Sequence, residues 1–547
     1  MNWKLILLFG GLLMAKSVPA APLHVYAVQA ISNVQHEFMP YRQGNEPPAT
    51  LYLRGCRGER LNAAFYISAC GEAKKLMVKV DQPQWDKHCD LRWVTRWWQA
   101  GRVSFESGRP QFVDELLLHN GNLVESNPFE VKNTYPEVPL DAETLQPLDI
   151  TCVPTPGILI GTEQGVMLTL IVPADKESGE YDFKLRVSAE GEKPVTVPVH
   201  LTVYPFDLPK PSVDYSMYYR ARFSKDPEAD SQNVNPEFRT DEQMLADLKN
   251  MVAHGCANPR AYIGGSEISR LLELRKQAGC DNTHLFLSVT CGPRVFKDDF
   301  DRSTFEQLKI HFEEVARQAL AQAEGYDVGT IYGYGKDEAK AATLHKQFPL
   351  WEGLRNGGVK ISSALSGMSE KDLLTIKEFL PDVIMRAGTW PTQKTTEILN
   401  ARGIRTYVYG HPGPSENPEG FRRTMGILLH NRPWIAGSME YALMHVWTGN
   451  EHPWDDFFGG SHPPSQYRSL MLVYPTSKGV VDTLQWEGFS EGVNDGRYLQ
   501  LLKSLKSGRT DVKKFLQRVL DEEDTIDMYE MRYQAASLII QIQEARK

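Results

Sequence analysis

The hydrophobic pattern of the chain changes near Leu208, and this change constrains the fold more than any other feature of the 547 residues. Before it, short runs of alternating apolar residues are separated by Gly, Pro, Asn and Asp, at 50–53, 61–67, 76–80, 166–172, 181–187 and 195–203. Alternation with almost no helical periodicity indicates half-buried strands. The first part of the chain is therefore predicted to be an antiparallel β-sandwich.

Beyond Pro211 the pattern alternates between strand and helix, and Pro205, Pro209 and Pro211 hold the change itself in an extended link. Strands are predicted at 215–219, 260–263, 285–289, 330–334, 360–364, 383–386, 406–409 and 442–447, with amphipathic helices such as 242–254, 305–324, 370–379 and 393–402 between them. This count favours a (β/α)8 TIM barrel, and a doubly wound open sheet is the competing interpretation.

The predicted fold is therefore multidomain. We expect a signal peptide at 1–20, the β-sandwich at 21–208 and the barrel at 209–475. A C-terminal helical region at 476–547, with helices over 498–506 and 511–545, is expected to pack on the barrel.

The N-terminus predicts export to the periplasm or out of the cell. Lys4 precedes an apolar stretch at 5–13, and small residues at Val18 and Ala20 suit signal-peptidase cleavage. An uncleaved anchor is the alternative, but this stretch is short for a bilayer and no later run has membrane-helix length. The seven cysteines match no zinc spacing, and their odd count leaves at least one thiol unpaired.

The charge balance argues against nucleic acid as a partner. Lys4 and Lys16 are two of the 60 basic residues, so the mature chain keeps 58 against 69 acidic residues, a net charge of −11. Phosphate binding draws on clustered Lys and Arg, which such a chain lacks overall. A neutral or cationic ligand is easier to accommodate.

Barrel enzymes carry their functional groups at the carboxyl ends of the strands, and aromatic side chains are frequent at those positions here. The candidates for pocket walls are Tyr332, Tyr334, Trp390 and Trp447. Flat apolar faces of sugars stack on such rings while polar groups bind the hydroxyls. Any single ring is more often ordinary core or interface packing, but as a group at strand ends these residues favour a carbohydrate site.

Two adjacent carboxylates, Asp337 and Glu338, close the fourth predicted strand in the string YGYGKDE. A carboxyl group partly desolvated by neighbouring rings could protonate a glycosidic oxygen. On a regular strand successive side chains point to opposite faces, so both can enter one pocket only if the backbone turns. An adjacent pair suits substrate-assisted hydrolysis, in which the 2-acetamido group of the sugar is the nucleophile, one carboxylate orients it and the other is the acid and base.

Several strings resemble glycoside hydrolase family 123. They are VPADKESGEYDF and VYPFDLP within residues 146–209, YGYGKDE, and YPTSKGVVDTLQWEGFSEGVNDGRYLQ within 472–502. The resemblance implies a β-N-acetylgalactosaminidase-like enzyme in which Asp337 orients the amide and Glu338 is the general acid and base. Ala339, Trp486 and Asn494 depart from the family pattern, and they leave the identity of the sugar open.

Other candidate ligands of the substrate follow the predicted strands. Tyr409 could bond the acetamido carbonyl, Arg220 with Arg222 could hold an acidic portion of a glycan or form a structural ion pair, and His411 could bond a hydroxyl. His445 with Glu440, and His452 with Glu451, lack a third ligand at metal spacing, so neither a metal nor a cofactor is predicted.

Three functional hypotheses follow. The first is an exported, retaining, substrate-assisted hydrolase of terminal N-acetylhexosamine, with an oligosaccharide or glycoconjugate as partner. The second is a glycosidase of the same scaffold without acetamido assistance, and the third is a catalytically silent glycan-binding protein. Membrane insertion is not expected, and the oligomeric state cannot be predicted.

Overall fold

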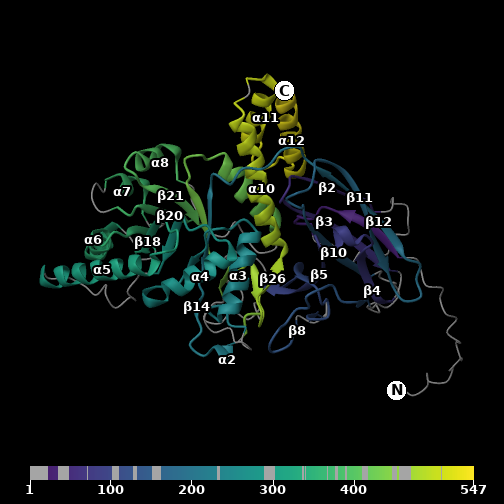
Figure 1. The fold of residues 1–547 in the computed structure, drawn as a ribbon, viewed down its shortest axis with the longest axis horizontal. Helices are drawn as coiled ribbons and strands as arrows, with labels where there is room; N and C mark the ends of the chain where they lie inside the picture. Colours follow the sequence, from purple (N-terminus) through teal and green to yellow (C-terminus); the bar gives the residue numbers. More distant parts are fainter. Residues whose placement is uncertain are drawn as a thin grey trace, which may run out of the picture.

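The structure is a computed structural model in which a β-sandwich lies beside a closed barrel, with a long helix running between them (Figure 1). It describes residues 23–34, 49–69, 72–100, 110–126, 132–150, 162–230, 234–288, 302–335, 338, 341–365, 368–375, 380–387, 391–409, 417–445, 452–454, 470–506 and 508–547. The predicted signal peptide at 1–20 lies outside these residues.

The sandwich consists of a larger and a smaller sheet. The larger sheet has the order β1 (His24–Val28), β3 (Arg60–Ala69), β10 (Thr162–Ile171), β5 (Cys89–Ala100), β6 (Pro110–Leu118), β26 (Val480–Thr483) and β25 (Val473–Pro475). The smaller sheet has the order β2 (Leu51–Gly55), β12 (Val195–Val203), β11 (Gly179–Ser188), β4 (Ala73–Val80) and β9 (Leu148–Ile150). Buried apolar residues of both sheets form one core, among them Phe65, Trp93 and Val199. The predicted antiparallel sheets are confirmed, except that β12 and β2 pair in parallel.

The chain returns to the sandwich after it has built the barrel. Strands β25 and β26 pair with each other, and β26 pairs with β6 through Asp482 opposite Leu117. Short two-residue strands form three further pairs: β7 (Glu125–Ser126) with β8 (Asn133–Thr134), β14 (Arg222–Phe223) with β15 (Phe238–Arg239), and β23 (Met444–His445) with β24 (Leu470–Met471).

Within the described residues, eight parallel strands close into a barrel. Their order is β13 (Asp214–Tyr219), β16 (Arg260–Ala261), β17 (His284–Leu287), β18 (Thr330–Tyr334), β19 (Lys360–Ala364), β20 (Val383–Ala387), β21 (Arg405–Tyr409) and β22 (Gly437–Glu440). Because these eight strands close on themselves, the competing interpretation of a doubly wound open sheet is excluded. The predicted eighth strand at 442–447 is wrong, because the strand that closes the barrel is Gly437–Glu440, whose sequence GSME has no apolar run. Residues Met444–His445 instead pair with β24.

Helices alternate with the barrel strands in the chain order. They are α3 (Asp241–Ala253), α4 (Ile268–Ala278), α5 (Arg302–Ala323), α6 (Phe348–Asn356), α7 (Glu370–Thr375), α8 (Gln393–Asn400) and α9 (Pro418–Arg423), with a π-helical turn η4 (Thr424–Leu428) after α9 and 3₁₀ turns η1 (Gly265–Glu267) and η3 (Ala341–Gln347). Two four-residue helices, α1 (Pro83–Asp86) and α2 (Pro227–Asp230), lie in connections. Strand residues alternate between a core against these helices, with Met217 and Ile331, and a barrel interior, with Phe286 and Met385.

The C-terminal helices are α10 (Leu484–Ser504), α11 (Thr510–Asp521) and α12 (Met528–Glu544). Helix α10 begins directly after β26, and the side chain of Thr483 caps it by accepting from the Trp486 amide. It runs between the barrel and the sandwich (Figure 1) and contacts α9, η4, β3 and β6. A Cβ on Gly488 would lie 2.3 Å from the Pro418 carbonyl oxygen, and one on Gly492 would lie 2.4 Å from that of Arg422. Glycine at these positions therefore lets α9 approach closely.

The C-terminal helices also share a core with the sandwich. Tyr204 and Phe206, which follow β12, pack with Tyr498 of α10 and Met531 of α12. The helical region thus packs on both neighbours. No helix among the described residues is long and apolar enough to cross a membrane.

Candidate active site at the carboxyl end of the barrel

The fourth strand in the barrel order, β18, ends where the sequence predicts the catalytic carboxylates. The Gly335 amide still donates to the Ser362 carbonyl at 2.8 Å, so pairing with β19 continues one residue beyond Tyr334. Glu338 follows in a turn and is exposed. Asp337 lies outside the described residues.

The backbone at Glu338 has left the strand conformation. Its φ of +48° lies in the left-handed region, which a residue with a Cβ adopts at a cost of about 1 kcal/mol or more. A continued strand would send successive side chains to opposite faces. The chain has therefore left the extended conformation of β18 at Glu338.

Tyrosines from several strands gather in the barrel interior at this end. The hydroxyl of Tyr218 on β13 lies 3.2 Å from that of Tyr334 on β18. The Tyr218 ring centroid lies 6.1 Å from that of Tyr409 on β21 and 5.2 Å from that of Tyr441, which follows β22. The structure therefore brings the predicted residues Tyr334 and Tyr409 together around Tyr218. Tyr332 instead stacks on Phe286 at 5.0 Å, one layer deeper in the interior.

Arg260 on β16 is a component of this cluster that the sequence interpretation missed. Its guanidinium carbon lies 3.5 Å from the centroid of the Tyr334 ring and 4.7 Å from that of Tyr218. The side chain is buried, and its Nε and Nη1 atoms have no hydrogen-bond partner among the described residues. Faces of aromatic rings attract such a cation, so the tyrosines stabilise it in place of a carboxylate. Its only signal in the sequence is an arginine inside a predicted strand.

Arg220, which follows β13, is held by an ion pair. Its Nε and Nη2 atoms lie 2.8 and 2.6 Å from Oε1 of Glu237, and Nη1 donates to the Tyr441 hydroxyl at 2.6 Å. Arg222 reaches the other oxygen of Glu237 at 3.4 Å. Arg220 thus orients Tyr441 beside the tyrosine cluster, and an acidic sugar would have to compete with Glu237.

Two buried titratable groups lie near the end of β22. Burial raises the pKa of Glu440 to about 8, and the hydroxyl of Ser438, which donates to the carboxyl group at 3.0 Å, offsets only part of this shift. Glu440 is opposite Met217 in the register, so it belongs to the face that packs on the helices. Burial, and then Arg220, lower the pKa of His445 to about 4.

Three further predicted site residues, Trp390, His411 and Trp447, lie outside the described residues, as Asp337 does. Of the predicted site, Glu338, Tyr334, Tyr409 and Arg220 are therefore described.

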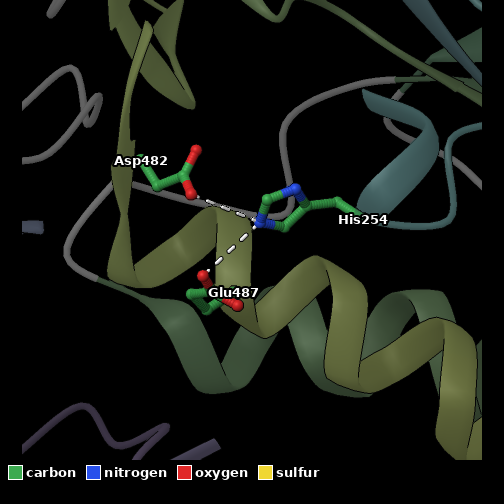
Figure 2. Close-up of side chains that lie close together, drawn as sticks. All are labelled: His254, Asp482 and Glu487. Atoms are coloured by element: carbon green, nitrogen blue, oxygen red, sulfur yellow. Dashed lines mark hydrogen bonds and ion pairs between the residues drawn. The ribbon is translucent and has the colours of Figure 1, made fainter. Parts of the chain in front are cut away.

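A second polar cluster joins the sandwich, the barrel and α10. The Nε2 atom of His254, which follows α3, lies 3.4 Å from Oε1 of Glu487 and 3.6 Å from Oδ2 of Asp482 (Figure 2). A histidine with two carboxylates has the composition of a metal site.

Arginines from the sandwich already neutralise these carboxylates. Arg92 donates to Glu487 at 2.6 Å and to Asp482 at 2.7 Å, and Arg60 lies 2.5 Å from Glu487. The Nδ1 atom of His254 bonds the Asn250 carbonyl oxygen at 2.8 Å. A divalent cation here would face two guanidinium groups at close range, so we assign the cluster to an ion-pair network that holds the domains together.

Neither the protein-family models nor the curated proteins contain a match. Among solved structures, a family 123 glycoside hydrolase from Clostridium perfringens matches with a TM-score of 0.65 and 13% identity, covering 96% of this chain and 98% of that one.

Two other matches have lower TM-scores. A GH5 xyloglucanase from Bacteroides ovatus has a TM-score of 0.31 at 8% identity, covering 86% of this chain and 100% of that one. A family 39 glycoside hydrolase from Bacteroides cellulosilyticus has a TM-score of 0.34 at 11% identity, covering 60% and 73%. Neither score supports an argument about the fold. Over nearly its whole length, the chain has the fold of a family 123 glycoside hydrolase, which confirms the resemblance at the level of the fold.

Proposed function

We propose that this protein is an exported glycoside hydrolase that removes terminal N-acetylhexosamine, with β-linked N-acetylgalactosamine as the substrate to test first. The C. perfringens protein with this fold is described as acting in glycolipid glycan hydrolysis. The similarity in fold supports the reaction class, and the residues at the end of β18 support the mechanism.

The position and backbone of Glu338 carry the proposal. Glu338 follows the carboxyl end of the fourth barrel strand, where barrel enzymes place reacting groups, and the chain turns there. It is exposed, so a substrate can reach it. The tyrosine cluster around Tyr218 lies at the same end of the barrel.

In the proposed reaction, the carbonyl oxygen of the 2-acetamido group attacks the anomeric carbon. The bond to the leaving oxygen breaks as Glu338 protonates that oxygen, and the sugar becomes a bicyclic oxazolinium ion. Asp337 orients the amide and stabilises the positive charge on it. Glu338, now a carboxylate, takes a proton from water as the water attacks the anomeric carbon, so the configuration is retained.

The remaining predicted residues bind the sugar. Tyr409 bonds the acetamido carbonyl, and Trp390 and Trp447 stack on the apolar face of the ring. Tyr334 lines the pocket floor over Arg260, and His411 bonds a hydroxyl. Arg220 reaches an acidic substituent where the substrate carries one.

A panel of 4-nitrophenyl glycosides with and without a 2-acetamido group tests the proposal. We expect hydrolysis of the N-acetyl-β-galactosaminide, with inhibition by a thiazoline analogue of the intermediate. Cleavage of other glycosides without thiazoline binding would refute substrate assistance while keeping the hydrolase. A folded protein that cleaves none of these glycosides but binds glycans would show that the barrel is catalytically silent.

Export is tested separately. Expression of the full-length chain in its own type of cell, followed by N-terminal sequencing, is expected to give a mature chain that starts near Ala21.

A further inference from the structure

The outer face of the smaller sheet carries two rows of polar and aromatic side chains. Residues of β2, β12 and β11 alternate between the core and this face. In the register of these strands, Tyr52 lies beside His200 and His200 beside Asp182. The second row is Arg54, Thr202 and Glu180.

Helix α12 lies next to this face (Figure 1). Its side chains and those of the sheet together line a groove. Tyr533, Ser537, Ile540 and Gln541 follow the helical spacing that places side chains on one face. They line the groove together with the residues of the two rows other than Asp182. The groove has a volume of about 650 Å³, and Tyr204 lies at its inner end. This size is in the range of small-molecule sites.

The aromatic part of the groove is both exposed and fixed in orientation. Tyr52 is 59% exposed, although large apolar rings are usually covered. Its ring stacks on that of His200, with centroids 5.2 Å apart and an angle of 25° between the planes. His200 is held in turn by Asp182, whose carboxylate lies 2.5 Å from Nδ1. Because the two rings stack face to face, His200 covers one face of the Tyr52 ring and leaves the other as an aromatic platform, whose orientation needs little further ordering when a ligand binds.

The polar part of the groove offers both donors and acceptors. The guanidinium of Arg54 lies over the Tyr533 ring at 4.8 Å, and it makes no hydrogen bond or ion pair with any described residue. One oxygen of Glu180 accepts from the Thr202 hydroxyl at 2.8 Å, which leaves the other for a ligand. A cation and a carboxylate at the two ends of the row next to this ring platform suit a ligand rich in hydroxyl groups.

From this arrangement we infer that the groove binds a neutral oligosaccharide, with one sugar ring stacked on Tyr52 and its hydroxyls bonded by Arg54 and Glu180. Glu180 in the groove and Asp182 beside it oppose an anionic ligand, since Arg54 is the main cation of the two rows. The open shape of the groove suits a chain of sugars that continues past its ends. The site lies on the sandwich and does not depend on the reaction proposed for the barrel.

The inference is tested by calorimetry on the full-length chain with cellotriose, β-1,4-galactotriose and chitotriose. We expect at least one trisaccharide to bind with a Kd on the order of millimolar or below. Tyr52→Ala and Arg54→Ala are each expected to weaken this binding about tenfold, whereas Tyr52→Phe retains the platform and the binding. Arg186→Ala is the matched control, because Arg186 is exposed on β11 beyond the residues that line the groove.

The outcomes separate this groove from the barrel site. Unchanged hydrolysis of nitrophenyl glycosides by Tyr52→Ala, together with lost trisaccharide binding, supports a second site. The inference is overturned if no trisaccharide binds at millimolar concentration, or if binding survives both alanine substitutions. Tighter binding of a sulfated chondroitin tetrasaccharide than of any neutral one, if it is lost in Tyr52→Ala, would also overturn it. Thermal unfolding of each variant shows that the fold is retained.

Discussion

Replacing Glu487 by glutamine is expected to weaken the junction between the sandwich, the barrel and α10. The Glu487 side chain is fully buried and accepts from Arg60 at 2.5 and 3.0 Å, from Arg92 at 2.6 Å and from Asn62 at 3.1 Å. The glutamine keeps the shape but removes the negative charge that compensates two buried guanidinium groups.

The magnitude follows from what remains after the change. Removing one partner of a buried ion pair costs about 3–5 kcal/mol. Arg92 keeps Asp482 at 2.7 Å, whereas Arg60 keeps only a contact of 3.9 Å to the same residue. We therefore expect the free energy of unfolding to fall by about 3 kcal/mol, the lower end of that range.

Urea unfolding followed by tryptophan fluorescence measures the effect, since Trp486 lies beside Glu487 in α10. Glu313→Gln is the matched control, because Glu313 pairs with Arg317 on the exposed surface of α5 and such pairs contribute less than about 1 kcal/mol. If Glu487→Gln unfolds at the same urea concentration as Glu313→Gln, the network does not stabilise the junction.

The same substitution has a pH signature. Burial alone would raise the pKa of Glu487, but Arg60 and Arg92 outweigh it and hold that pKa well below its usual range. A carboxylate with a lowered pKa stabilises the fold above its unfolded pKa of about 4.3, and this contribution is lost as the pH falls through the folded pKa. The difference in stability between wild type and Glu487→Gln should therefore shrink in acid.

Three further predictions concern other residues. Because the pKa of Glu440 is about 8, the folded state keeps a proton that the unfolded state loses above about pH 4.3, and the stability of the wild type falls between those pH values. Urea unfolding at several pH values should show that Glu440→Gln removes this fall, and an unchanged pH dependence would contradict the prediction. Burial lowers the pKa of His119, but the hydrogen bonds that its ring donates to Asp141 and Asp90 raise this pKa to about 9. The stability that His119 contributes is therefore complete below about pH 6.5 and lost by about pH 9; an NMR titration midpoint near the unperturbed value of histidine would refute this. Gly492→Ala should lower the melting temperature more than Gly508→Ala, because only the first places a Cβ against backbone, and equal melting temperatures would show that α9 can move away from α10.

The local pattern of the sequence predicted most of the strands because alternating burial is written in neighbouring residues. Strand β18 was predicted with its exact bounds, from the alternation in TIYGY. The strand that closes the barrel was missed, because Gly437–Glu440 carries glycine, serine and glutamate where a strand signal needs apolar residues. The pairing of β26 with β6 joins residues 117 and 482, and no local pattern reports so distant a contact.

The candidate site, too, was predicted where the signal is local and missed where it depends on distant contacts. Strand ends located Tyr334, Tyr409 and Glu338 at one end of the barrel, because the parallel strands of a barrel share a direction. Arg260 was missed since its strand is two residues long and buried arginines usually have an acidic partner. The groove beside α12 was missed because it forms between segments that lie more than 300 residues apart in the sequence, such as those that contain Tyr52 and Tyr533.

The hydrolysis of 4-nitrophenyl N-acetyl-β-galactosaminide by wild type and by Glu338→Gln tests the proposed function most directly. Wild type is expected to release nitrophenol, and Glu338→Gln to lose about 10²–10⁴-fold in kcat with unchanged thermal unfolding. The loss is expected in kcat because nitrophenolate leaves without protonation, whereas the attack of water on the intermediate still needs Glu338 as the base. Equal turnover by the two proteins, or no turnover of any N-acetylhexosaminide by folded wild type, would contradict the role assigned to the end of β18.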